Sequence, residues 1–188
     1  MAGKGKTAEV LFLLVTVIVL FSMPACGYWA TELRVPRMPE EELDALKEEL
    51  KTTYWLEDME ISNIDVVRMS ITVSRGGMQE IYSFRPGARF YLNGAQSCAM
   101  GLRPVTSRDF CLANLYFNAQ GRLMLVEGLY YALAIEIQSW SREGGFLVTS
   151  SGEKISCRPD CRWEMGIKPG KEALVVLDFN GKARMARL

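Results

Sequence analysis

Residues 173–187 read ALVVLDFNGKARMAR and contain the clearest turn signal in the chain. The pair Asn180-Gly181 stands between two apolar runs. An Asn-Gly pair in that setting is typical of a two-residue hairpin turn, because both central residues of that turn need a positive φ. The sequence therefore predicts a β-hairpin over these residues.

Short apolar runs separated by turn residues continue from this hairpin back to residue 64. IDVVRMSITV (64–73) alternates, Arg75-Gly76-Gly77 predicts a turn, and QEIYSF (79–84) completes a hairpin. The strings FNAQGR, SSGEK and FNGKAR share one strand-turn-strand pattern. Further strands are expected at 115–118, 122–127, 131–138, 145–149, 173–179 and 182–187. Together these runs predict a mainly antiparallel, β-rich domain over residues 61–188.

A segment with helical periodicity precedes this domain. EEELDALKEELKTTYWLE (40–57) carries acidic residues in its first turn, where they interact favourably with the helix dipole. The apolar stripe at helical spacing consists of Leu43, Leu46, Leu50 and Tyr54. We therefore expect an amphipathic helical stalk within residues 32–60, entered after Pro36 and Pro39.

An apolar segment stands near the start of the sequence. Lys4 and Lys6 precede VLFLLVTVIVLF (10–21), the pattern of a charged region followed by an apolar region in export signals. The stretch 10–31 has no charge, and a helix rising about 1.5 Å per residue over that length could cross a hydrocarbon core about 30 Å thick. Residues 1–31 are therefore predicted to form a leader and a membrane anchor.

The expected fold class is α+β, with an N-terminal transmembrane or signal helix and an amphipathic helix followed by the β-rich domain. Lysines that precede an apolar segment stay in the cytoplasm, so everything after the segment is expected outside. This places the chain in the cell envelope, anchored in the membrane, with its C-terminal domain where disulfides persist.

Three processing outcomes of the apolar segment remain open. In the first, Met23-Pro24-Ala25-Cys26-Gly27 resembles the motif at which a bacterial lipoprotein is cleaved and lipidated, so that Cys26 begins the mature chain. In the second, Lys4-Gly5-Lys6-Thr7-Ala8-Glu9-Val10-Leu11-Phe12 resembles the leader of type IV pilins and pseudopilins, with one residue deleted and Lys6 in place of phenylalanine. In the third, the segment is an uncleaved anchor.

The order of the predicted elements extends the second resemblance to the whole chain. A pilin-like leader, a helix, a hairpin and repeated strand-turn-strand units form the layout of the minor pseudopilins of type II secretion and of related pilus and competence subunits. The resemblance implies cleavage after Gly5, an N-terminal helix in a filament core and a β-rich head outside. Glu9 would neutralise the N-terminal amine of a neighbouring subunit. The chain departs from the pattern of a long continuous helix at Pro24, Gly27, Pro36 and Pro39.

The composition excludes several functional classes. The chain has 22 basic and 22 acidic residues and thus no net charge, so no nucleic-acid partner is expected. It has no histidine, the residue that most often serves as general base, metal ligand or neutral-pH switch. We therefore expect a non-enzymatic protein with no cofactor and no metal.

Four cysteines lie in the β-rich domain: Cys98, Cys111, Cys157 and Cys161. In an exported domain, two local disulfides are the simplest pairing, although four cysteines allow three pairings and the sequence does not choose among them. The alternative is a zinc site formed by all four, but their spacing is not that of a zinc knuckle.

A hydrolase or a sugar-binding surface would use other side chains. The acidic residues closest to predicted strands are Glu127, Glu136, Asp109 and Asp178, and nothing in their spacing pairs two of them as a glycosidase requires. The aromatic residues that could form a binding platform are Trp140, Trp163, Tyr130 and Tyr131. Their isolated or alternating positions favour the protein core instead.

The sequence thus predicts a membrane-tethered envelope subunit of the pilin or pseudopilin type, a component of a secretion, pilus or DNA-uptake assembly. Its partners would be the membrane and other envelope or filament subunits. The alternative is an exported lipoprotein, anchored through Cys26, whose β-rich domain binds a ligand or a partner. The residue that begins the mature chain separates the two predictions.

Overall fold

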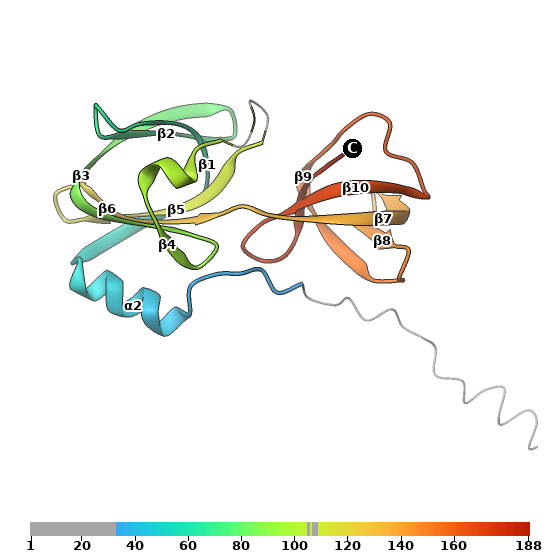
Figure 1. Cartoon of the computed structure of the whole chain (residues 1–188), viewed down its shortest axis with the longest axis horizontal. Helices are drawn as coiled ribbons and strands as arrows, with labels where there is room; N and C mark the ends of the chain where they lie inside the picture. Colours follow the sequence, from blue (N-terminus) through green and yellow to red (C-terminus); the bar gives the residue numbers. More distant parts are fainter. Residues whose placement is uncertain (1–32, 105, 107–108) are drawn as a thin grey trace, which may run out of the picture.

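The computed structural model describes residues 33–104, 106 and 109–188. Within this part of the chain the structure is mostly β, with a single α-helix. Figure 1 shows two β bodies side by side, with α2 against the first of them. The elements are α2 (Glu40–Glu49), β1 (Thr52–Asp65), β2 (Ser70–Arg75), β3 (Met78–Leu92), β4 (Ala95–Ser97), the 3-10 helix η1 (Ala99–Leu102), β5 (Cys111–Asn118), β6 (Leu123–Leu129), β7 (Tyr131–Ser141), β8 (Phe146–Thr149), β9 (Lys154–Trp163), β10 (Lys171–Leu177) and β11 (Ala183–Arg187).

The first body is a sheet with the strand order β2-β1-β5-β6-β3-β4, and it closes into a barrel because β2 also pairs with β3. The β3–β6 pair is parallel, and the other pairs are antiparallel. β3 is long enough to face β2 with residues 78–83 and β6 with residues 84–92. The interior is apolar and includes Ile61, Val73, Phe90, Leu115 and Val126.

The second body is a closed barrel with the order β10-β11-β9-β8-β7. Its β9–β11 pair is parallel, and the other pairs are antiparallel. The two barrels share one topology if β4 is left out and the strands of each barrel are numbered 1 to 5 along the chain. Both then have the strand order 1-2-3-5-4-1, and a parallel pair joins the third and fifth strands, β3–β6 in the first barrel and β9–β11 in the second. This is the topology of the OB-fold, a likeness that by itself assigns no function.

A single residue, Tyr130, separates β6 from β7, so these strands form one ribbon through both barrels (Figure 1). The Asn93 side chain holds this junction, because its Nδ2 donates to the Tyr130 carbonyl and its Oδ1 accepts from the Tyr130 amide, both at 2.9 Å. Leu112 and Leu129 of the first barrel pack together with Phe179 of the second. Covalent, polar and apolar contacts therefore join the barrels.

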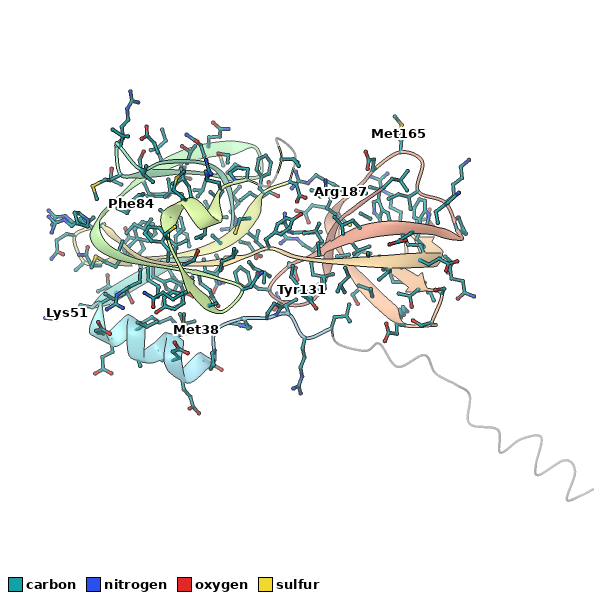
Figure 2. The ribbon with its side chains drawn as sticks, viewed as in Figure 1. Met38, Lys51, Phe84, Tyr131, Met165 and Arg187 are labelled. Atoms are coloured by element: carbon teal, nitrogen blue, oxygen red, sulfur yellow. The ribbon has the colours of Figure 1, made fainter. Side chains whose placement is uncertain are left out.

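Residues 33–39 form a strap that crosses both barrels. Leu33 and Val35 pack against the core of the second barrel. Met38 is 1% exposed and packs with the leucines of α2 against the outer face of the first barrel (Figure 2). The strap is a further link between the two barrels.

The predicted α+β fold class is wrong. The amphipathic helix expected over 40–57 ends at Glu49, and no other α-helix occurs in the described residues. Lys51 has a φ of +52°, a left-handed conformation that ends the helical path, and Thr52 begins β1. Tyr54, expected on the helical stripe, lies in β1 instead. The segment that starts at Thr52 is rich in β-branched and aromatic residues, and these favour a strand paired with β5. That preference outweighs the leucine spacing that predicts a helix.

The predicted N-terminal helix and membrane anchor lie outside the described residues. In the described part of the chain, no helix combines the length and the apolar character that crossing a membrane requires.

The strands expected after residue 110 are present as β5, β6, β7, β8, β10 and β11. The run 64–73 is not one strand, because a turn over 66–69 separates β1 from β2. β9 is not predicted by the sequence, since Pro159 between two nearby cysteines is typical of a loop.

The three recurring turn strings adopt one geometry. A glycine with positive φ donates its amide to the carbonyl of the residue three positions earlier, and the side chain of that earlier residue accepts a second amide from the turn. The earlier residues are Asn118, Thr149 and Asp178, and the glycines are Gly121, Gly152 and Gly181. The hairpin predicted at Asn180-Gly181 is confirmed, but its loop starts at Asp178, and Asn180 does not have the positive φ of a two-residue turn.

Gly94 lies where the strap crosses the first barrel. Its φ is +77°, and a Cβ at this position would lie 2.7 Å from the carbonyl carbon of Arg37. We expect Gly94→Ala to lower the free energy of unfolding by about 2–4 kcal/mol, because it adds a backbone clash to left-handed strain. Chemical denaturation of the purified full chain measures this loss.

Gly170→Ala is the matched control for this prediction. Gly170 has a φ of +76°, but nothing lies within 4 Å of the position of its Cβ. The substitution should therefore cost about 1 kcal/mol, which is the left-handed strain alone. Equal losses of unfolding free energy in the two variants would show that the strap is not in close contact with Gly94.

Candidate functional site

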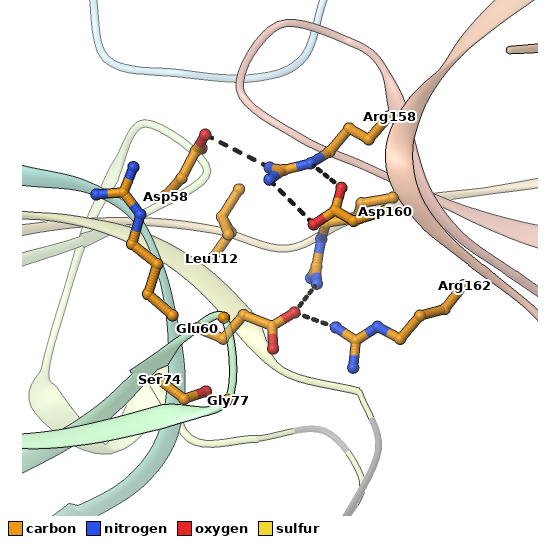
Figure 3. A pocket seen from close by; sticks show the side chains of 11 residues that line it. Asp58, Glu60, Ser74, Gly77, Leu112, Arg158, Asp160 and Arg162 are labelled. Carbon is orange, nitrogen blue, oxygen red and sulfur yellow. Dashed lines mark hydrogen bonds and ion pairs between the residues drawn. The ribbon is translucent and has the colours of Figure 1, made fainter.

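The two barrels face each other across a polar cavity of about 280 Å³. β1, β2 and β5 line it from the first barrel, and β9 and β11 line it from the second. Its charged residues are Asp58, Glu60, Arg75, Arg158, Asp160, Arg162 and Arg184. We call this cavity the arginine cleft (Figure 3). Four arginines and three acids give it one excess positive charge.

A bulge in β1 directs Asp58 into the cleft. Leu56 pairs with Leu115 and Met59 with Ala113, so β1 accommodates one extra residue between these pairs. Asp58 has a φ of +58°, a left-handed conformation that costs a non-glycine residue on the order of 1 kcal/mol. Local backbone strain therefore accompanies the position of this carboxylate.

A larger bulge in β9 carries the residues that face Asp58. Cys157 lies opposite Ala183 and Arg162 opposite Met185, so five steps along β9 match two steps along β11. The extra residues, 158–160, arch toward the first barrel (Figure 3). We call them the β9 arch.

Arg158, at the start of the β9 arch, binds acids from both barrels. Its Nε lies 2.9 Å from Asp160, and its Nη1 lies 3.4 Å from Asp58 and 3.8 Å from Asp178. Burial lowers the pKa of Arg158, but the three carboxylates raise it above its usual value. Burial likewise raises the pKa of Asp160, and the Arg158 guanidinium brings it below its usual value. The arch is therefore fixed by ion pairs on both sides.

Arg184 of β11 is buried deep in the cleft, with a side chain that is 4% exposed. Its Nη2 donates to the Phe110 carbonyl, and its Nη1 lies 3.5 Å from Oε1 of Glu60. Its Nε and Nη1 have no hydrogen-bond partner among the described residues. Burial lowers the pKa of Arg184, because desolvation disfavours the charged form.

One carboxylate serves two guanidinium groups in the cleft. Oε1 of Glu60 accepts a hydrogen bond from Nη2 of Arg162 and is also the ion-pair partner of Arg184 (Figure 3). The site therefore has more donors than acceptors. Guanidinium groups bind carboxylate and phosphate oxygens in pairs, so the arrangement is suited to an additional oxyanion.

A second cavity, of about 450 Å³, shares Arg162 with the arginine cleft. Asp109 lines it and is 1% exposed. Its Oδ2 accepts a hydrogen bond from the Tyr130 hydroxyl at 2.5 Å and forms an ion pair with Nη2 of Arg187 at 2.8 Å. Burial and the hydrogen bond to Asp109 raise the pKa of Tyr130. Arg187 thus lies between the barrels in a second polar contact (Figure 2).

The acidic residues considered from the sequence do not form a catalytic pair. Asp109 and Asp178 are both ion-paired with arginines of the second barrel. Glu127 is buried and accepts hydrogen bonds from an asparagine and a tyrosine, whereas Glu136 is exposed on β7. No hydrogen bond joins any two of these four in the residues that the structure describes, and neither the arginine cleft nor the second cavity is lined by two of them.

The predicted core position is wrong for one aromatic residue. Trp140 is 40% exposed, and its ring stacks on that of Trp163 with a centroid distance of 5.0 Å and an interplanar angle of 22°. Tyr131 packs against the core of the second barrel, as expected. Tyr130 lies at the barrel junction.

Sequence reasoning does not find the arginine cleft. Its charged residues are scattered over β1, β2, β9 and β11, where single charges resemble solvated surface residues. The only hint in the sequence is Arg158-Pro159-Asp160 between two cysteines. This string predicts a loop, but it does not predict that the loop faces the first barrel. Gly5, Lys6, Glu9 and Cys26 lie outside the described residues, so their roles in processing stay predictions.

The Cys157 and Cys161 thiols flank the β9 arch, and Sγ of Cys157 donates to the Ile155 carbonyl. Interaction with the Cys161 thiol lowers the pKa of Cys157, and interaction with the Cys157 thiol together with burial raises the pKa of Cys161. Cys111 is buried in the first barrel, where desolvation raises its pKa to about 12, and Cys98 is exposed. Among the described residues, no group of side chains is arranged to hold a metal ion.

In an oxidising compartment, we expect the chain to contain a disulfide between Cys157 and Cys161. The register with β11 keeps Cys157 about 6–7 Å from Arg162, the residue that follows Cys161, which is close to the Cα separations that a disulfide spans. Asp-N protease cleaves before Asp160, so the two halves should stay linked in an unreduced digest and separate after reduction. A bond from either cysteine to Cys98 or Cys111 would contradict this pairing.

Comparison with protein-family models and with curated proteins finds no match to this chain.

Proposed function

We propose that this chain is a membrane-tethered, non-enzymatic envelope protein that binds an oxyanion, the carboxylate or phosphate group of a ligand or partner, in the arginine cleft. The observation that carries the proposal is Arg184. Its guanidinium is almost fully buried beside a polar cavity and still has Nε without a hydrogen-bond partner among the described residues. A charge that is buried and incompletely paired is costly, and a bound oxyanion removes that cost.

The geometry around Glu60 supports the same proposal. This carboxylate is shared by Arg162 and Arg184, so neither guanidinium has a carboxylate of its own. A ligand carboxylate or phosphate brings at least two acceptor oxygens and can bind a guanidinium through two parallel hydrogen bonds. Arg158 at the rim of the cleft is already paired with three carboxylates, so the guanidinium groups available to a ligand are those of Arg162 and Arg184.

The tether is proposed on the N-terminal sequence. A lipid anchor at Cys26 or an apolar helix over 10–31 would hold the two barrels at a membrane surface on the exported side. A filament or secretion-assembly subunit, with cleavage after Gly5, is the second candidate function, and the observation that favours it is the pilin-like leader.

Replacing the internal carboxylate tests the oxyanion site. Glu60→Gln leaves Arg184 without its ion-pair partner, so the free energy of unfolding should fall by about 1–3 kcal/mol. Inorganic phosphate or propionate should then restore stability, because ligand binding stabilises the folded state by RT ln(1 + [L]/Kd). The measurement is the thermal midpoint of the detergent-extracted full chain over a series of phosphate or propionate concentrations.

Glu49→Gln is the matched control, because Glu49 pairs with Arg89 on the surface at 3.1 Å, away from the cleft. Salt stabilises many proteins nonspecifically, so the decisive quantity is the extra gain of Glu60→Gln over Glu49→Gln. Equal gains in both variants would refute the site. Arg162→Gln in the otherwise native chain should weaken phosphate binding about tenfold or more by calorimetry, which tests the site without altering the buried arginine.

The mature N-terminus separates the two modes of attachment. Intact mass and N-terminal peptide mapping should be carried out on membrane-extracted protein from a bacterium that has both processing peptidases. A diacylated Cys26 is the expected start and supports the tethered binding protein. A start at Lys6 would replace this proposal by the filament-subunit function, and a start at Met1 would leave an uncleaved anchor.

A further inference from the structure

The cavity next to the arginine cleft has both an apolar and a charged wall. Phe110, Trp163 and Met185 contribute to the apolar wall, and Asp109 and Arg187 to the charged wall. We call this cavity of about 450 Å³ the aromatic pocket. Arg162 lines both the pocket and the cleft, so the two cavities adjoin at this side chain.

The Trp163 ring is positioned before any ligand binds. It stacks on Trp140 with a centroid distance of 5.0 Å, and Trp140 is itself exposed to solvent. A ring already held by a neighbour loses little conformational freedom when an apolar group packs against it. The aromatic pocket is therefore suited to an aromatic or large apolar group.

The charged wall has two polar atoms that lack hydrogen-bond partners among the described residues, Oδ1 of Asp109 and Nε of Arg187. Their side chains form an ion pair through the other oxygen of Asp109, which leaves one unpartnered acceptor and one unpartnered donor on this pair of side chains. An amide group offers the complementary N–H and C=O. Because Nε of Arg184 is also unpartnered, the interface matches an acid linked to an amide.

We propose that the cleft and the pocket together bind the carboxyl-terminal residue of a peptide. The carboxylate lies at Arg162 and Arg184, the preceding amide lies at Asp109 and Arg187, and an aromatic or large apolar side chain fills the aromatic pocket. This inference rests on the proposed function, since the oxyanion site supplies the anchor for the carboxylate. A simple phosphate ion would occupy the arginine cleft alone.

Three small probes test each part of this ligand in calorimetry with the detergent-extracted full chain. N-acetylphenylalanine contains the acid, the amide and the aromatic ring. It should bind about tenfold or more tightly than N-acetylglycine, which lacks the ring, and than N-acetylphenylalaninamide, which lacks the acid. Equal binding of N-acetylglycine would overturn the role of the pocket, and equal binding of the amidated probe would overturn the role of the cleft.

Trp163→Leu should abolish the preference for N-acetylphenylalanine over N-acetylglycine and leave the binding of inorganic phosphate unchanged. Trp55→Leu is the matched control, because Trp55 is 54% exposed on β1 and lines neither cavity, and it should retain the preference. In the unaltered protein, nuclear Overhauser effects should connect the phenyl protons of the probe with the Trp163 indole. This measurement keeps the test valid if Trp163→Leu fails to fold.

Phosphate separates the failure of this inference from the failure of the proposed function. Phosphate binding without any preference among the three probes would overturn the peptide ligand and leave the oxyanion site intact. Absence of phosphate binding together with absence of probe binding would overturn both.

Discussion

Arg184 carries a positive charge into the interface between the barrels, where its side chain is only 4% exposed. A buried guanidinium is stable only when fixed acceptors surround it. Arg184 belongs to the second barrel, but its acceptors, Glu60 and the Phe110 carbonyl, come from β1 and from the segment that enters β5. The barrels therefore cannot rotate or separate without leaving this charge unpaired. Their relative position depends on it.

Each sheet closes into a barrel, and this closure explains why the contact between the two barrels is made by side chains. Apart from the short strand β4 at the end of the first sheet, these closed barrels have no free strand edge through which backbone groups could pair with a neighbour. Bulges are the local means by which a closed barrel redirects side chains, and one occurs on each side of the interface. The strained Asp58 and the β9 arch face each other, and the ion pair between Asp58 and Arg158 offsets part of the strain.

Local chemistry could be predicted from the sequence, and non-local pairing could not. The recurring turns depend on a glycine and on a side chain that accepts a backbone amide, both within five residues, so Gly121, Gly152 and Gly181 were readable as turns. The end of α2, the length of β1 and the division into two barrels depend on pairing between distant strands, such as the parallel β9–β11 pair. The cleft depends on that same pairing, because it brings Arg162 and Arg184 to Glu60 from more than 100 residues away.

Three independent links hold the arginine cleft in one shape before any ligand arrives: the strap, the β6–β7 ribbon held by Asn93, and the ion pairs themselves. A rigid site loses little entropy on binding, which favours affinity. Glu60 lowers the affinity, because an incoming oxyanion must share the two guanidinium groups with this internal carboxylate or replace it. The cleft should therefore discriminate by the number and geometry of the acceptor oxygens rather than by charge alone, since only a group that bridges both guanidiniums improves on Glu60.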